Sequence, residues 1–194
     1  VFYNWGGSRS GYNADTDSLA RYNFINTAYF RGPDSRAAVS FHEGNARARA
    51  WFAGNAMDGA VPADPWSLVT GQTGGGYRLS APVPAEPVTT TTAAIAYRAV
   101  LAKAGASHRR DTVDARVLAG VAGRTGRQID TQAETGGWPQ LAPGAAPADR
   151  DGDGMPDAWE RRHRSDPARS DAWAGVDRAG RANLDRYLDS IVQR

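Results

Sequence analysis

The first 80 residues alternate short apolar or aromatic runs with turn-forming segments. The runs occupy residues 1–5, 20–30, 38–41 and 50–53, and segments rich in Gly, Pro and Asn separate them. Recurrent short runs bounded by turn residues are typical of β-strands. The pattern therefore favours an all-β architecture for residues 1–80.

A weak internal repeat favours one kind of all-β architecture. Phe2-Tyr3-Asn4 recurs as Phe24-Ile25-Asn26, and a related segment runs from Trp51 to Asn55. An aromatic residue and an Asn in register predict the stacked coils of a parallel β-solenoid. The Asn side chains of such coils can hydrogen-bond along the stack. The alternative is a β-sandwich in which these Asn residues only form turns.

Residues 81–140 show a helical pattern instead. After a Pro-rich connector, the apolar spacing predicts a helix over residues 93–104, with Thr92 as its N-cap. A second helix is predicted over residues 112–122, with Asp111 as its N-cap. Two short amphipathic helices in this position are expected to cover the strands, and neither carries an evident chemical motif.

A segment rich in Ala, Pro and Gly then leads into an acidic loop that matches the twelve-residue calcium-binding pattern. The carboxylates at its ligand positions are Asp149, Asp151, Asp153, Asp157 and Glu160. Gly154 stands at the sharp turn, and Met155 would add its backbone carbonyl. Because no helix precedes the loop, we expect a small appendage in which calcium has a structural role. The alternative is a solvated acidic turn.

A second, degenerate loop follows at residues 177–185. It has neutral or basic residues at two ligand positions, so the pattern does not establish calcium binding there. The closing helix is predicted over residues 183–193, with an apolar face that packs on Trp159 and Trp173.

Composition narrows the classes of function. Cys is absent, which excludes disulfides, a thiol nucleophile and Cys-based zinc sites. The 23 basic and 21 acidic residues give a net charge of +2, too small a field to recruit nucleic acid. No apolar run approaches the length of a membrane span. Val1 lies inside a strand-like run without an initiator Met, and we expect a mature product or a piece of a longer protein.

Several segments together resemble bacterial pectate lyases of the parallel β-helix class. The late coils of those enzymes are resembled by Tyr3-Asn4-Trp5-Gly6-Gly7-Ser8, Trp51-Phe52-Ala53-Gly54-Asn55 and Asp64-Pro65-Trp66-Ser67. Their C-terminal region is resembled by residues 105–117 and by Gly136-Gly137-Trp138-Pro139, and residues 149–188 resemble the calcium-loop extension that some of them carry.

The resemblance implies an all-β fold with the terminal coils of a right-handed parallel β-helix in residues 1–80. Covering α-helices would follow in residues 81–140, and a small calcium-loop α-helical tail in residues 149–194. It also implies the C-terminal part of a secreted polysaccharide lyase that cleaves pectate (polygalacturonate) by calcium-assisted β-elimination. Pectic polysaccharide is the expected partner, with neither nucleic acid nor membrane. The chain would be a monomer or pair with an N-terminal portion.

The chain departs from the family pattern where the catalysis is concerned. The family's base is an arginine in an Arg-x-Pro-x-x-Arg or similar pattern, and acidic residues on middle coils hold its catalytic calcium. Neither pattern occurs here. We therefore assign no catalytic residue, expect the catalytic centre upstream of Val1, and expect the segment to be inactive alone.

Three residues on a Gly-flanked loop are candidates for substrate contact: Arg9, Tyr12 and Asn13. Arg can pair with a uronate carboxylate and Tyr can stack on a sugar face, although these residues can also simply shape a turn. His42 and Glu43 are interpreted as structural. The alternative function is a non-catalytic β-solenoid that binds carbohydrate or a cell surface. A polygalacturonase-type hydrolase is less favoured, because the strands lack paired Asp residues.

Overall fold

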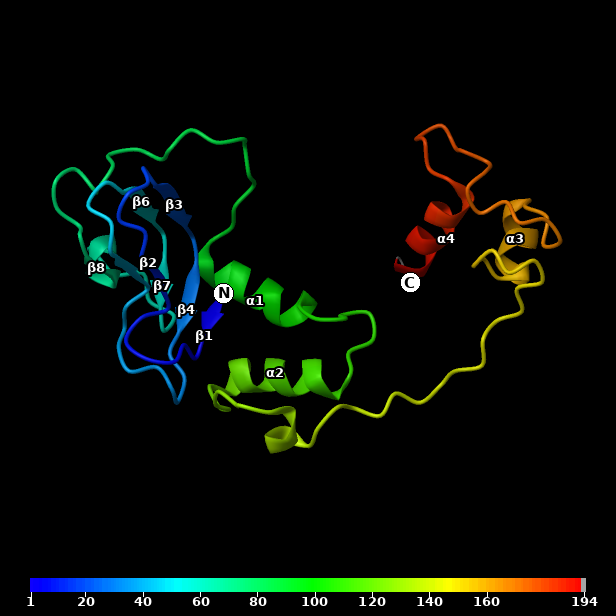
Figure 1. Cartoon of the computed structure of the whole chain (residues 1–194), viewed down its shortest axis with the longest axis horizontal. Helices are drawn as coiled ribbons and strands as arrows, with labels where there is room; N and C mark the ends of the chain where they lie inside the picture. Colours follow the sequence, from blue (N-terminus) through cyan, green and yellow to red (C-terminus); the bar gives the residue numbers. More distant parts are fainter. Residues whose placement is uncertain (193–194) are drawn as a thin grey trace. The chain divides into compact units, whose positions relative to one another are not determined.

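The computed structural model describes residues 1–192 and separates into two compact units. Unit 1 is Val1–Pro139 and unit 2 begins at Gln140. Figure 1 shows the strands and two helices of unit 1, and the two helices of unit 2. The strands of unit 1 are β1 (Phe2–Tyr3), β2 (Gly11–Asn13), β3 (Arg21–Ile25), β4 (Ala28–Phe30), β5 (Phe41–Glu43), β6 (Arg49–Ala53), β7 (Ala56–Met57) and β8 (Val69–Gly71). Its helices are α1 (Ala93–Lys103) and α2 (Thr112–Gly123), with short 3-10 turns at Pro65–Leu68 and Gln132–Thr135.

The strands of unit 1 form three small parallel sheets. Their orders are β1-β4-β7, β2-β5-β8 and β3-β6. Each strand from β1 to β5 therefore pairs with the strand three places further along the chain. In the longest pairing, Phe24 of β3 lies opposite Phe52 of β6, and Ile25 lies opposite Ala53. In this order, a strand lies beside the strand that occupies the corresponding place in the next pass of the chain.

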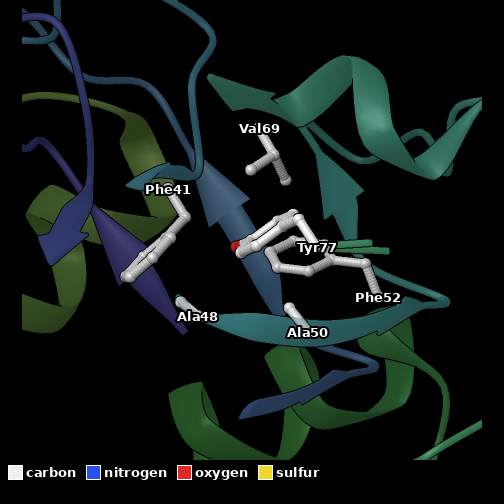
Figure 2. Close-up of a cluster of buried hydrophobic side chains, with 6 residues drawn as sticks. All are labelled: Phe41, Ala48, Ala50, Phe52, Val69 and Tyr77. Atoms are coloured by element: carbon white, nitrogen blue, oxygen red, sulfur yellow. The ribbon is translucent and has the colours of Figure 1, made fainter. Parts of the chain in front are cut away.

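The main core of unit 1 lies between these sheets. On β6 the side chains alternate, so that Ala50 and Phe52 are buried while their neighbours are only partly covered. Figure 2 shows Phe52 and Tyr77 gathered with smaller side chains from β6 and β8. The ring of Phe24 packs within 4.6 Å of the Phe52 ring centroid and 4.9 Å of that of Phe41. This aromatic cluster packs β3, β5 and β6 against one another.

The two helices of unit 1 begin where the sequence predicts. The Thr92 side chain accepts a hydrogen bond from the Ile95 amide at 3.3 Å and begins α1. The Asp111 carboxylate accepts from two amides of the first turn of α2, each at 2.9 Å. Tyr97 of α1 packs on Phe30 of β4 with ring centroids 4.3 Å apart. Helix α1 therefore covers β4, as expected, whereas α2 contains no buried residue.

The predicted repeat is wrong in its register of Asn residues, although Phe24 and Ile25 do pair with Phe52 and Ala53. The partner of Asn26 is Gly54, at the turn that follows β3 and β6, and both have a left-handed backbone with φ of 54° and 65°. A Cβ on Gly54 would lie 2.0 Å from the Asn26 side-chain oxygen, so this position requires Gly. Asn55 instead accepts from the Thr27 amide at 2.9 Å and donates to the Phe24 carbonyl at 2.8 Å. The Asn residues satisfy separate turns and do not stack on one another.

The predicted all-β class, with a right-handed parallel β-helix, is also wrong. Helices account for 25% of the chain and strands for 16%, so the fold is mixed α/β. The strands are two to five residues long and form separate sheets of two or three strands, with no clear solenoid. The β-sandwich alternative fails as well, because every pairing between the named strands is parallel. Short aromatic runs between turns look alike in all these architectures, so their pattern does not distinguish one from another.

Unit 2 contains α3 (Asp157–His163) and α4 (Asn183–Val192) around a core of its own. Met155, Trp159 and Ala172 form this core, and Leu184 and Tyr187 of α4 pack against it. The predicted packing of the closing helix on Trp159 is confirmed. The packing on Trp173 is not, because that side chain is 75% exposed. The predicted helix end at residue 193 lies outside the described residues.

Of the helices within residues 1–192, none has both the length and the apolar character needed to cross a membrane.

Candidate functional site

The acidic loop of unit 2 folds around the carboxylate of Asp149. One of its oxygens accepts from the Gly152 amide at 2.8 Å, and the other accepts from the Gly154 amide at 3.0 Å. Both glycines have a left-handed backbone, with φ of 71° and 92°. These local bonds form a tight loop in which alternate carboxylates converge.

Two groups of acidic side chains meet at this loop and share one member. One oxygen from each of Asp149, Asp151 and Asp153 lies within 4.8 Å of the others, and so does one oxygen from each of Asp153, Glu160 and Asp171. The shared residue also joins the two segments directly, because Asp153 Oδ2 accepts from the Asp171 amide at 3.0 Å. The loop, α3 and the segment before α4 therefore contribute to one acidic centre.

Glu160 is the most unusual residue of this centre. Its side chain is 0% exposed, and neither carboxylate oxygen has a hydrogen-bond partner. Burial, together with the nearby carboxylates of Asp151 and Asp153, raises the pKa of Glu160 to about 7. Asp151 Oδ2 is also buried without a partner, and burial raises the pKa of that group. Buried, unpaired carboxylate oxygens are expected where a cation supplies the missing interaction.

Asp157, the other predicted ligand, lies outside both groups. Its Oδ1 accepts from the Arg150 amide at 2.8 Å, and its Oδ2 lies 3.3 Å from the Arg161 guanidinium. The hydrogen bond from the Arg150 amide, and the two guanidinium groups, lower the pKa of Asp157. Its role as a calcium ligand stays a prediction.

The donor set fits a hard divalent cation. Ca²⁺ takes about six to eight oxygen ligands, and carboxylates, carbonyls and water supply them. Several carboxylates converge here, and three of their oxygens are buried without a partner in the described structure. Asp171 is the member that the sequence did not reveal. It stands eighteen residues after Asp153 in the chain, outside the twelve-residue motif, so the motif gives no signal for it.

The degenerate loop at residues 177–185 has a different arrangement. Arg181 lies 2.8 Å from a carboxylate oxygen of Asp177 and 2.8 Å from one of Asp189. Hydrogen bonds from the Arg181 amide and guanidinium lower the pKa of Asp177. The Arg181 guanidinium thus compensates the charges of both carboxylates.

In unit 1, two of the three predicted substrate residues lie together at the surface. The Arg9 guanidinium lies over the Tyr12 ring, 5.1 Å from its centroid, and Tyr12 is 62% exposed. Asn13 is engaged elsewhere, because its amide donates to Glu43 Oε1 at 2.9 Å. The structure therefore brings Arg9 and Tyr12 to one outer surface, while Asn13 supports the turn beneath it.

Tyr12 belongs to a row of side chains across the β2-β5-β8 sheet. It lies opposite His42, which lies opposite Thr70, and the His42 ring nitrogen Nδ1 is 3.0 Å from the Thr70 hydroxyl. Glu43 points the other way and is buried, with one oxygen accepting from the Asn45 amide at 2.9 Å. His42 and Glu43 thus point to opposite faces and cannot act as an acid/base pair. This agrees with their structural interpretation.

A pocket of about 440 Å³ lies elsewhere on unit 1, beside α2 and the end of β1. Its lining includes Tyr3, Arg116, Val117 and Glu134, and none of the predicted substrate residues. The Glu134 carboxylate accepts from the Asp130 and Thr131 amides, so it holds a local turn. We assign no chemistry to this pocket.

Comparisons with known proteins give one consistent relationship. No family model matches the chain, and no solved structure matches it. Among curated proteins, it is similar to the "probable pectate lyase C" of Aspergillus terreus (32% identical), Neosartorya fischeri (31%) and Aspergillus flavus (30%). Each alignment covers 99% of this chain and 47% of the relative, so the chain spans about half the length of the curated relatives it matches. The similarity is to proteins named as probable pectate lyases. It does not support the bacterial branch, because these relatives are fungal.

Proposed function

We propose that this chain is part of a secreted polysaccharide lyase that cleaves pectate by β-elimination. The observation that carries the proposal is the similarity to proteins named probable pectate lyase C along 99% of the chain. Pectic polysaccharide is then the substrate class, and the family's chemistry requires neither nucleic acid nor a membrane.

In β-elimination, a base removes the proton next to the uronate carboxyl, and the glycosidic oxygen leaves as a double bond forms. Cations beside the carboxyl stabilise the negative charge that develops on it. Within the described residues, unit 1 contains no group of three side chains able to hold a metal ion. It also lacks the family's arginine pattern. We therefore derive no proton-transfer or calcium step from these residues, and we propose that the chain alone has no turnover.

The contribution of unit 1 would be to bind the polysaccharide. The exposed Tyr12 ring offers a flat apolar face for a sugar, and Arg9 beside it offers a cation for a uronate carboxylate. Asn13 would act indirectly, by fixing the turn through Glu43. The expected result is that Arg9→Ala and Tyr12→Ala each weaken retention of the chain on immobilised polygalacturonate, while Arg98→Ala, in the exposed part of α1, leaves it unchanged. Equal retention of all variants would remove these residues from the proposal.

The contribution of unit 2 would be a structural calcium site at the acidic loop. Asp149, Asp151, Asp153 and Glu160 converge there, and the unpartnered oxygens of Glu160 support a bound cation. Calcium bound there would hold the appendage folded and take no part in the elimination. The test is calorimetry, in which Asp151→Ala is expected to abolish the heat of calcium binding. Undiminished binding would refute the loop assignment.

A non-catalytic carbohydrate-binding role is the second candidate, favoured by the exposed Tyr12 beside Arg9 in a unit without catalytic residues. The two candidates differ in product. A lyase releases an unsaturated uronide from polygalacturonate, whereas a binding module retains the polymer unchanged. The assay that separates the two candidates uses the longest protein that the gene encodes. Both candidates allow this chain by itself to bind polygalacturonate without cleaving it.

A further inference from the structure

Glu160 on α3 has a buried carboxylate without a partner among the described residues. It is 0% exposed and has no hydrogen-bond partner for either oxygen, so nothing in the described chain offsets the cost of its burial. A charged group in this position is expected to have a cationic partner. The described structure places no arginine, lysine or histidine in an ion pair with it.

Two carboxylates from different segments of unit 2 lie close to Glu160. Oxygens of Asp153, from the loop, and of Asp171, from the segment before α4, lie within 4.8 Å of a Glu160 oxygen and of one another. Three carboxylates at this separation repel one another unless a cation lies between them. The contact does not depend on one flexible side chain, because the Asp171 amide also donates to Asp153 Oδ2 at 3.0 Å.

Asp157, the ninth residue of the loop, belongs to neither group of converging carboxylates and is paired with arginine instead. Arg150 donates its amide to one Asp157 oxygen at 2.8 Å, and the Arg150 and Arg161 guanidinium groups lie 3.7 Å and 3.3 Å from the other. Its charge is therefore already compensated by arginine. In contrast to Glu160, both of its oxygens have partners in the described structure.

We propose that Asp171, and not Asp157, supplies the last carboxylate of a calcium site whose other carboxylates come from the loop and Glu160. This inference rests on the proposed calcium loop and extends it. The site is then not a self-contained twelve-residue loop. It is closed by a residue from outside the motif.

The extension has a structural consequence for unit 2. Asp171 Oδ1 accepts from the Asn183 side chain at 3.1 Å, and Asn183 begins α4. The next residue, Ala172, is buried against Met155 and Trp159. A cation bound to Asp171 would therefore tie the loop and α3 to the start of α4 across the small core. Calcium would order α4 as well as the loop.

The experiment is a titration of CaCl₂ into the whole chain, stripped with chelator, followed by calorimetry. Wild type is expected to bind calcium, and Asp171→Asn to weaken the affinity at least about tenfold, since affinity follows the number of charged ligands. Asp157→Asn and the control Asp166→Asn, an exposed carboxylate of the same unit, are expected to stay within about threefold of wild type. Hydrogen exchange supplies a second readout: calcium is expected to protect α4 in wild type and not in Asp171→Asn.

The outcomes separate this inference from the loop proposal. Absence of calcium binding by wild type would overturn both. Normal affinity in Asp171→Asn, or loss of affinity in Asp157→Asn alone, would overturn this inference and leave the loop proposal intact.

Two features of the variants distinguish a ligand role from a structural one. Asp171→Asn keeps an oxygen that can accept from Asn183, and Asp171→Glu restores the charge. Recovery of affinity in Asp171→Glu supports a ligand role. In chelator, α4 is expected to be equally protected in wild type and in Asp171→Asn. Lower protection of α4 in Asp171→Asn than in wild type, with both in chelator, would show that the role of Asp171 is purely structural and would overturn the inference.

Discussion

Replacing Glu160 by Gln is expected to have different effects in the absence and the presence of calcium. In chelator, wild type holds a buried carboxylate with two unpartnered oxygens. A buried unpaired polar group costs about 1–3 kcal/mol, and a charged one costs more. Glu160→Gln removes this charge at nearly constant volume. Unit 2 of the variant is therefore expected to be more stable than wild type in chelator, by about 1–3 kcal/mol.

Calcium is expected to stabilise only wild type. For a dissociation constant on the order of 10⁻⁵ M, about 1 mM calcium corresponds to roughly 100 times that constant and adds about 2.7 kcal/mol to the folded state. Glu160→Gln loses one of the converging carboxylates and is expected to lose most of this gain. The stabilities of the two proteins should thus differ in chelator and become similar in calcium.

The assay is hydrogen exchange of the α3 and α4 amides, with and without calcium, at pH 8. This pH lies above the value of about 7 to which burial raises the Glu160 pKa, so wild type is ionised. About 1.4 kcal/mol corresponds to a tenfold change in exchange rate. Calcium should slow exchange about a hundredfold in wild type and only slightly in Glu160→Gln. A variant less stable than wild type in chelator would refute the reasoning, because it would show that the carboxylate already has stabilising partners.

Three further substitutions test other parts of the structure. Phe52→Ala removes a 2% exposed side chain from the core of unit 1 and should lower the unfolding free energy by about 3–5 kcal/mol in urea; a loss near zero would contradict the described core. Asp58→Asn removes ion pairs to Arg31 and Arg124 at 2.6 Å and 3.1 Å but tolerates the left-handed backbone, and should cost about 1 kcal/mol by the same method; an unchanged midpoint would mean that these pairs contribute nothing. Arg181→Ala should cost about 0.5–1 kcal/mol and leave the calcium stoichiometry at wild-type level, whereas an additional calcium ion would show that the degenerate loop keeps a usable ligand set.

Local signals in the sequence predicted local structure well. The caps Thr92 and Asp111 begin α1 and α2 as expected, because a cap depends only on the amides of the next turn. The face of α4 that meets Trp159 also follows from helical spacing alone.

Long-range relationships were not predictable in the same way. The pairing of Phe24 with Phe52 depends on the path of the chain between β3 and β6. An alignment that matches the Asn residues of the two segments gives a different register. The mixed α/β class was not predictable from residues 1–80 for a related reason, because short strand-like runs do not reveal how the strands assemble into sheets. At the acidic centre, the loop motif revealed Glu160 but not Asp171, because that residue reaches the centre only through the tertiary structure of unit 2.

The central claim is that the chain is part of an enzyme that cleaves pectate by elimination. The most direct test incubates polygalacturonate with the longest protein that the gene encodes and measures the ultraviolet absorbance of unsaturated uronide products, with added calcium and with chelator. We expect unsaturated products from the longest protein with calcium and none from residues 1–194 alone. Saturated products, or no products from the longest protein at alkaline pH with calcium, would contradict the claim.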